Sequence, residues 1–477
     1  MTINILPDDV LLLIFYLDRV IHFDPHRPGD RLHRPWRWHR LVHVCRRWRS
    51  VVFASPTFLD LRLVCYPGTT VELTRIWPPF PIIITDDYPW EIPEYYEFDV
   101  ASEHPNRVCQ INLVDLLSSK FQRLVSAMQR KFPALTHLDL GVSDSYGRMP
   151  ASALPDGFLG GSAPHLQSLG LSYIPFPALP KLLLSSTDLV CLALEKIPNS
   201  GYISPEAIVT SLAMLTNLKF LTLGFHSPRS HSDQEGRRIP PPTRSVLPTL
   251  TRFQFKGVVE YLEDLVARID TPLLDSIWIT FFHQRTFDIP QLAHFMRRTP
   301  RFQELNEAYV DFGDSFVQVG YFSPTKTSDE NSGLRIISCE HLRWLFPSLA
   351  HIFTSLFPSI HMVENLCIYE PRYFPRPWPD DPENMQFLEI FRPFVAAKNL
   401  YVGDRSQAYF ARALREFVWG GMTEVLPSLQ NIFMESLQSY FQEDIGEFIV
   451  ARQLSGHSIT VSLWERAAEN SEITDDL

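Results

Sequence analysis

The 477-residue sequence predicts an α/β protein in which a short, all-helical N-terminal segment precedes a long solenoid of strand–helix repeats. Two observations predict this fold. A motif of one apolar residue, two variable residues and then apolar-x-apolar recurs along the chain, and amphipathic helical patterns lie between its copies. Strands and helices that alternate in one direction form a parallel β-sheet on a concave face, with the helices on the convex face.

The copies of the motif begin about 23 to 34 residues apart along most of the chain. They are FLDLRL from Phe58, VCQINL from Val108, LTHLDL from Leu135, LQSLGL from Leu166, LVCLAL from Leu189, LKFLTL from Leu218, LTRFQF from Leu250, LDSIWI from Leu274, VENLCI from Val363, AKNLYV from Ala397 and LQNIFM from Leu429. The interval between Leu274 and Val363 leaves room for about three further copies. FQELNEAYV near Phe302 is one degenerate candidate.

The intervening helices carry their own start signals. One helix is predicted within 116–132, and another after Ser204, which is placed to cap it with Pro205 in the first turn. Asp288 and Gln291 have the spacing of a capping box at the start of a third.

Two further helices are predicted at the N-terminus. Pro7 suits a first helical position, and Asp8 and Asp9 favour the positive end of a helix dipole. From Val10 to Leu17 every side chain is apolar or aromatic, so this helix must be buried on all sides. In the second helix one apolar face is formed by Leu41, Val44, Cys45, Trp48 and Val52.

The expected organisation has three parts: a helical segment over 1–57, a solenoid over 58–464 and an acidic tail over 465–477. An Arg- and Pro-rich linker over 18–39 separates the two N-terminal helices. Polar or Pro-rich inserts interrupt the repeats near 226–245, 323–333 and 371–384.

Composition narrows the class of protein. A formal net charge of −11 argues against a protein-wide surface for nucleic acid or membranes. The six cysteines are scattered and no Asn begins a glycosylation sequon, which favours an intracellular compartment, the cytoplasm or the nucleus. The first apolar stretch is too short to span a bilayer, and acidic residues stand where a signal peptide needs basic ones.

No pattern points to catalysis. The sequence has no P-loop, no H-E-x-x-H, no G-x-S-x-G and no Gly-rich dinucleotide turn, so we expect no enzyme activity, cofactor or metal. The clearest charged feature is the Arg-rich stretch from Arg27 to Arg49 with its three tryptophans. It is consistent with an acidic protein partner, with nucleic acid, or simply with a solvated face opposite the apolar stripe.

The N-terminal segment resembles an F-box, whose pattern is L-P-x-E-[VI]-L-x-x-I-F, a linker and then V-C-x-x-W. The resemblance implies docking on a Skp-family adaptor, and through it on a cullin and a RING subunit, by the residues that match the pattern: Leu6, Pro7, Val10, Leu11, Ile14, Phe15, Leu41, Val44, Cys45 and Trp48. Asp9 replaces the commoner Glu, and the linker is about ten residues longer than usual.

The rest of the chain resembles the leucine-rich repeats that follow the F-box in many such proteins, especially those of the large fungal families. This resemblance implies a substrate receptor of an SCF-type ubiquitin ligase, with an unidentified protein substrate on the repeats. If the register is correct, the open face of the sheet presents candidate substrate contacts: Phe220, Arg252, Lys256, Trp278, Tyr369, Tyr401 and Phe433. A register slip by one residue would turn them inward.

An alternative is a repeat scaffold that joins no ligase, in which the F-box helices only cap the first repeat. Burial of Leu11 and Phe15 against Leu61 and Leu63 would favour the cap, and exposure would favour a partner.

Overall fold

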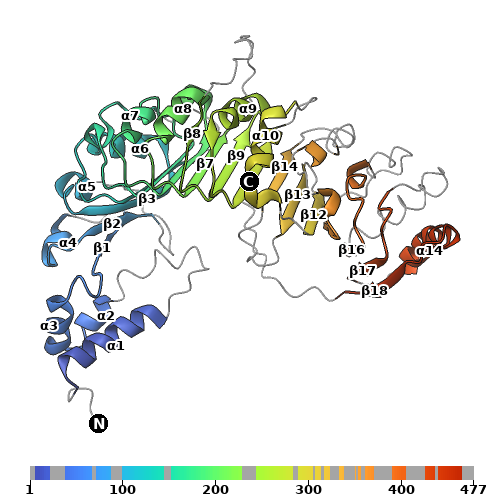
Figure 1. Cartoon of the computed structure of the whole chain (residues 1–477). Coiled ribbons are helices and arrows are strands. Elements are labelled where there is room, and N and C mark those ends of the chain that lie inside the picture. The colour runs from blue at the N-terminus through green and yellow to red at the C-terminus, as the bar shows by residue number, and fades with distance from the viewer. Residues whose placement is uncertain are drawn as a thin grey trace. The chain divides into compact units, whose positions relative to one another are not determined.

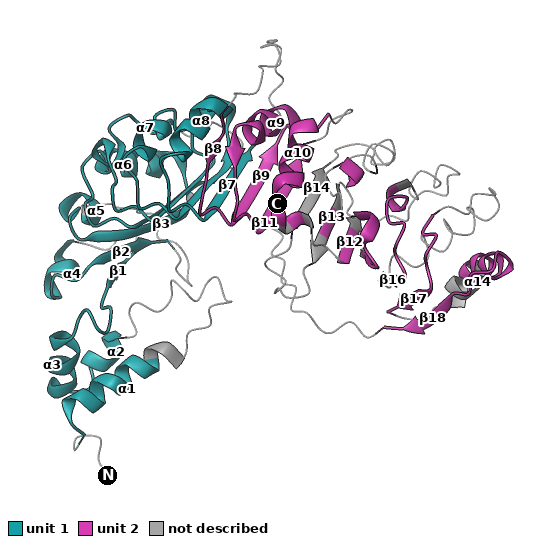
Figure 2. Ribbon diagram, viewed as in Figure 1, with its two compact units in different colours: residues 1–226 teal, residues 227–477 magenta. Residues whose placement is uncertain are grey.

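In the computed structural model the chain forms two compact units, Met1–His226 and Ser227–Leu477 (Figure 2). Each unit is considered by itself. The structure describes residues 6–21, 38–66, 71–86, 99–143, 152–227, 243–282, 288–303, 307–312, 316–322, 332–337, 350, 353–355, 360–369, 389–403, 425–435 and 439–464.

The first unit begins with three helices, α1 (Asp8–Ile21), α2 (Trp38–Val42) and α3 (Arg46–Ala54). The single second helix expected from the sequence is therefore wrong. Cys45 is extended, with φ −158° and ψ 170°, and its Sγ accepts a hydrogen bond from the backbone N–H of Trp48 at 3.5 Å. Cys45 thus caps α3, and Val44 and Trp48 do not share one helical face.

The predicted parallel sheet is present in the first unit (Figure 1). Seven strands pair in chain order and all are parallel: β1 (Leu63–Cys65), β2 (Ile82–Thr85), β3 (Val108–Leu116), β4 (His137–Val142), β5 (Ser168–Ser172), β6 (Cys191–Ile197) and β7 (Phe220–Phe225). The connections contain α4 (Val71–Ile76), α5 (Asp99–Glu103), α6 (Ser118–Ala127), α7 (Leu179–Leu183), α8 (Pro205–Leu212) and the 3₁₀ turns η3 (Phe158–Gly161) and η4 (Asn199–Gly201). Helices α5 to α8 lie along one face of this sheet (Figure 1).

The core of the first unit follows from the alternation of side chains along each strand. In β4, Leu138 and Leu140 are buried, whereas His137 and Asp139 are exposed on the opposite face. Ser204 caps α8 by accepting from the N–H of Ala207, as predicted. Strand β2 was not predicted, because its sequence IIIT contains no leucine and all four of its side chains are buried.

The second unit contains a larger mixed sheet and a two-stranded one, β8 (Ser245–Val246) with β10 (Ile269–Asp270). In spatial order the larger sheet contains β9 (Arg252–Gly257), β11 (Ser276–Phe281), β14 (Ser332–Ile337), β13 (Phe316–Phe322), β12 (Glu307–Phe312), β15 (Asn365–Tyr369), β16 (Asn399–Val402), β17 (Asn431–Met434) and β18 (Thr460–Leu463). Its helical elements are α9 (Val259–Ala267), α10 (Pro290–Arg298), α14 (Ser439–Leu454), η5 (Pro300–Gln303), η8 (Ile360–Met362) and η10 (Glu389–Phe391).

The interval between the repeats at Leu274 and Val363 differs from the expected parallel copies. Strand β13 is antiparallel to both β12 and β14, and β14, not β12, pairs with β11. Only residues 313–315 separate β12 from β13, and such a short connection allows only a hairpin. The degenerate copy near Phe302 runs into β12, which pairs in parallel with β15.

Several expected features lie outside the described residues. They are most of the linker (22–37), most of the inserts (228–242, 323–331 and 370–388) and the acidic tail from 465 onward.

Candidate protein-interaction surfaces

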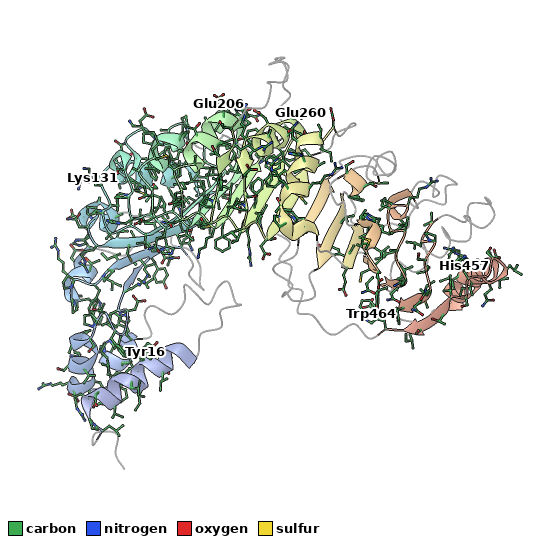
Figure 3. All side chains as sticks on the ribbon, viewed as in Figure 1. Tyr16, Lys131, Glu206, Glu260, His457 and Trp464 are labelled. Atoms are coloured by element: carbon green, nitrogen blue, oxygen red, sulfur yellow. The ribbon has the colours of Figure 1, made fainter. Side chains whose placement is uncertain are left out.

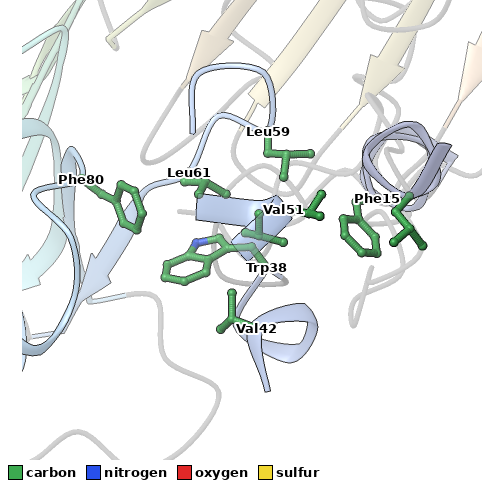
Figure 4. Packing of buried hydrophobic residues seen from close by; sticks show 9 residues of the cluster. Phe15, Trp38, Val42, Val51, Leu59, Leu61 and Phe80 are labelled. Carbon is green, nitrogen blue, oxygen red and sulfur yellow. The ribbon is translucent and has the colours of Figure 1, made fainter. Parts of the chain in front are cut away.

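Helix α1 has one buried face. Leu11 and Phe15 are 0% and 2% exposed. They belong to an apolar cluster, here called the junction cluster, which joins the N-terminal helices to the first repeat (Figure 4). Its buried members are Leu11, Phe15, Trp38, Val42, Val51, Val52, Leu59, Leu61 and Phe80.

Aromatic contacts fix the junction cluster. The ring of Phe15 lies 4.8 Å from that of Trp48. Trp38 packs edge-on against Trp77 and Phe80, at 5.3 and 5.4 Å, and its indole N–H donates to the carbonyl of Arg62 at 3.0 Å. The N-terminal helices therefore share a core with the first repeat.

The opposite face of α1 is apolar and exposed. Val10, Leu13, Ile14 and Leu17 are 36%, 52%, 39% and 42% exposed. Their spacing of i, i+3, i+4 and i+7 forms one stripe, here called the outer stripe. Elsewhere on the N-terminal helices Val44 is 58% exposed.

Arg47 fixes the start of α1 against α3. Its guanidinium bonds Oδ1 of Asp8 at 2.9 Å from Nε and 2.6 Å from Nη2, and it also donates to the carbonyl of Leu6. The ion pair is partly exposed, so it positions α1 but adds only modestly to the free energy of unfolding.

The ten residues implied by the F-box resemblance thus divide between two faces. Leu11 and Phe15 are buried, Leu6, Leu41 and Trp48 pack partly buried against the junction cluster, and Cys45 caps α3. Pro7, Val10, Ile14 and Val44 are exposed. The F-box pattern includes both the buried and the exposed residues, and the sequence alone did not distinguish them. It missed Leu13 and Leu17, although their helical spacing from Val10 could have identified them.

The open face in the first unit carries Phe220, one of the predicted substrate contacts. Phe220 is 37% exposed, whereas Leu221 and Leu223, whose side chains point to the other face of β7, are buried. On β4, Asp139 lies opposite Gly170, where a Cβ would come within 2.5 Å of Oδ1 of Asp139. Partial desolvation and the charge of Glu195 raise the pKa of the Asp139 carboxyl.

In the second unit the predicted register also holds. Lys256 is exposed, and Trp278, Tyr401 and Phe433 are half-buried between buried neighbours. Arg252 is half-buried and precedes the buried Phe253. The side chain of Tyr369 lies outside the described residues. Whether any of these residues binds a substrate stays a prediction.

The structure brings two of the predicted contacts together. Tyr401 and Phe433 are register partners on β16 and β17, and their rings stack 4.7 Å apart at an interplanar angle of 13°. Trp464, which the sequence reasoning missed, follows β18 and packs edge-on to Tyr401 at 5.2 Å (Figure 3 labels Trp464). We call Tyr401, Phe433 and Trp464 the aromatic corner.

A row of side-chain amides runs beside the aromatic corner. The amide of Asn365 donates to Glu307 at 3.2 Å, Asn399 donates to Asn365 at 2.8 Å, and Asn431 donates to Asn399 at 2.8 Å. The hydroxyl of Thr460 donates to Asn431 at 2.5 Å. We call this row the asparagine ladder; its sequence signal is Asn in the same position of NLCI, NLYV and NIFM.

The described part of the chain contains no group of three or more His, Cys, Asp or Glu residues that could hold a metal ion. None of its helices combines the length and the apolar character needed to cross a bilayer. Cys45, Cys65, Cys109, Cys191 and Cys367 are free thiols, and burial raises the pKa of Cys65 to about 12, which makes it unreactive.

Comparisons with known proteins support no family assignment. Neither a scan against protein families nor a search of curated proteins found a match. Among solved structures, a leucine-rich repeat-containing protein, LegL7 from Legionella pneumophila, aligns with 12% sequence identity and a TM-score of 0.27. The alignment covers 81% of this chain and 96% of the LegL7 chain. So distant a likeness carries no argument, and the repeat architecture rests on the strand pairing and side-chain alternation described above.

Proposed function

We propose that this chain is the substrate-recognition subunit of an SCF-type ubiquitin ligase. Its N-terminal helices dock on a Skp-family adaptor, which joins a cullin and a RING subunit, and its repeats hold a protein substrate. The chain itself is a non-catalytic, leucine-rich-repeat interaction scaffold in the cytoplasm or nucleus.

The observation that carries the proposal is the outer stripe. The terminal element of a solenoid needs a polar outer face for solubility, and α1 instead presents Val10, Leu13, Ile14 and Leu17. An exposed stripe with this spacing suits the groove or helix of a partner protein. The F-box resemblance supplies the class of partner, and Val44 adds exposed apolar surface on the same three-helix segment.

Capture of a Skp-family adaptor by the full chain tests the proposal. Leu13→Glu combined with Leu17→Glu places charge on the outer stripe and should lower adaptor capture at least about tenfold. Both side chains are exposed, so the thermal unfolding of the chain should change little.

Leu184→Glu combined with Met214→Glu is the matched control. These side chains are comparably exposed, at 52% and 53%, elsewhere in the first unit, and their substitution should leave adaptor capture intact. Absence of adaptor from a folded wild-type chain would sink the ligase proposal.

A second candidate is a scaffold whose helices act only as the N-terminal cap. Burial of Leu11 and Phe15 in one cluster with Leu61 favours this function, although Leu63 does not belong to that cluster. Capping uses the face of α1 opposite the outer stripe, so a cap and an adaptor site are compatible. The scaffold becomes the better description if the outer stripe proves to bind no adaptor.

A further inference from the structure

We propose that the aromatic corner of the second unit binds a proline-rich segment of a protein in the polyproline II conformation. The inference deepens the proposed function, because it rests on the repeats being the substrate-binding part and names a class of substrate.

The aromatic corner offers two ring surfaces at an angle. Phe433 lies nearly parallel to Tyr401, and Trp464 stands at 68° to it. All three residues are half-buried, so each is partly accessible to solvent. Flat aromatic surfaces of this kind accommodate the pyrrolidine rings of polyproline II segments, which are already ordered before binding.

The polar groups beside the rings include several donors. The carboxylate of Glu307 only accepts, which fixes the direction of the asparagine ladder. The Oδ1 atom of Asn399 is therefore taken by Asn431, and that of Asn431 by Thr460. Each of these amides uses one N–H in the ladder and has a second that no described residue accepts.

Two more donors belong to the aromatic corner itself. In the described part of the chain, no acceptor pairs with the hydroxyl of Tyr401 or the indole N–H of Trp464. Burial, with the neighbouring Cys367 and Glu307, raises the pKa of the Tyr401 phenol, so the hydroxyl stays protonated.

A surface with several donors suits a ligand that is rich in acceptors. Proline supplies a backbone carbonyl and no N–H, whereas any other residue brings an N–H that would need an acceptor. In polyproline II the carbonyls have no internal hydrogen bonds and are free to receive the Trp464, Tyr401 and asparagine donors. The donors of the face therefore suit the carbonyls of a proline-rich segment.

The chain contains a segment of this composition, PRYFPRPWPDDPEN, at residues 371–384. Because it is covalently attached, it is a potential competitor for a segment in another protein. The test therefore includes a variant without residues 371–384.

Fluorescein-labelled decaproline, titrated with the full chain and followed by fluorescence anisotropy, tests the inference. We expect saturable binding at least about tenfold tighter than that of a Gly-Ser decapeptide. Tyr401→Ala and Trp464→Ala should each weaken it by about tenfold or more, because stacked rings dominate such interfaces. Tyr401→Phe keeps the stack and removes one donor, so it should weaken binding by less.

Tyr202→Ala is the matched control, since Tyr202 is a half-buried aromatic residue of the first unit that is neither in the aromatic corner nor among the predicted substrate contacts, and its substitution should not affect binding. Tighter binding of decaproline to the variant lacking residues 371–384 would support the inference, because it would mean that this segment competes for the aromatic corner. Failure of decaproline to bind either form, or equal binding to wild type and Trp464→Ala, would overturn the inference. Binding of maltohexaose in place of decaproline would also overturn it and assign the face to a carbohydrate.

Adaptor capture tests the proposed function independently of decaproline binding. Trp464→Ala should still capture the Skp-family adaptor, because the outer stripe lies in the first unit. A chain that captures the adaptor and ignores decaproline would refute only the substrate class.

Discussion

His39 connects the N-terminal helices to the first repeat through its ring. The imidazole stacks on Trp77 at 4.9 Å and 11°, and in the described part of the chain its buried Nε2 has no hydrogen-bond partner. Burial, and secondarily the charge of His43, lower the pKa of His39. Protonation would place a charge on a nitrogen that has lost its water and has no acceptor.

This gives the first unit a predicted sensitivity to acid. A histidine whose pKa is lower in the folded state stabilises the fold above its ordinary pKa of about 6.5, and this contribution is lost as the pH falls below that value. We expect the melting temperature to drop between pH 7 and pH 5, and the drop to be smaller in His39→Gln. Equal pH dependence in the two proteins, measured by thermal unfolding, would contradict the prediction.

Asp139 should have the opposite pH dependence. Its carboxyl lies over Gly170 and is desolvated beside Glu195, so its pKa is raised in the folded state. A raised carboxyl pKa favours folding at low pH, and that advantage is lost as the pH rises through the folded-state value. Asp139→Asn should therefore stabilise the first unit at pH 7, by less than about 1 kcal/mol because the site is exposed. The gain should shrink in urea titrations toward pH 4; a constant gain would point to packing as its cause.

At the scale of elements, the two faces of α1 should respond differently to truncation. Phe15→Ala removes a buried ring from the junction cluster and should cost about 3–5 kcal/mol of unfolding free energy. Leu13→Ala on the outer stripe should change it by no more than about 0.5 kcal/mol while weakening adaptor capture. Urea unfolding followed by circular dichroism measures both, and similar losses would mean that α1 has no outer face.

Helix α10 depends on the helix before it. Asp288 and Gln291 suggested a local capping box, but the N-cap residue is Ile289, and the carboxylate of Glu263 on α9 accepts from the N–H groups of Gln291 and Leu292 at 2.9 and 2.7 Å. Glu263→Ala should cost about 0.5–2 kcal/mol, and Glu263→Gln less, because the amide keeps one acceptor. Chemical denaturation of the full chain checks the order of the two losses.

These elements show which parts of the fold are readable from sequence. The apolar-x-apolar repeats placed the inward side chains of β4, β7, β16 and β17 correctly, because a strand has a fixed two-residue period. Contacts between elements that are distant in sequence could not be predicted. The cap from Glu263, the division of the second helix at Cys45 and the order β11-β14-β13-β12 all depend on which elements meet in space.

The candidate surfaces were predictable to a similar degree. The residues of the F-box pattern and the open-face aromatics came from the sequence, but burial decided which of them face outward. Trp464 lacked any repeat signal because it follows a short terminal strand. The asparagine ladder has a sequence signal in the recurring Asn of NLCI, NLYV and NIFM, but its hydrogen bonds depend on the register of the strands.

At the scale of the first unit, the N-terminal helices are part of the repeat core. Deleting residues 1–57 would uncover Leu59, Leu61 and Phe80 on the side now filled by Leu11, Phe15 and Trp38. We expect the melting temperature of the first unit to fall by roughly 10 °C, the equivalent of several kcal/mol, and the shortened protein to bind a hydrophobic dye. An unchanged melting temperature would mean that the helices are an independent appendage.

The reversed strand order in the second unit has a consequence for synthesis on the ribosome. In the first unit each new strand pairs with the one made just before it, so a growing sheet has one open edge that the next strand covers. In the second unit one edge of β11 stays unpaired until β14 has been made, when Trp278 pairs with Gly333. One edge of β12 likewise stays unpaired until β15 has been made, when Glu307 pairs with Asn365. We therefore expect the nascent chain to expose two unpaired strand edges at once, and to fold slowly and be open to aggregation along this stretch.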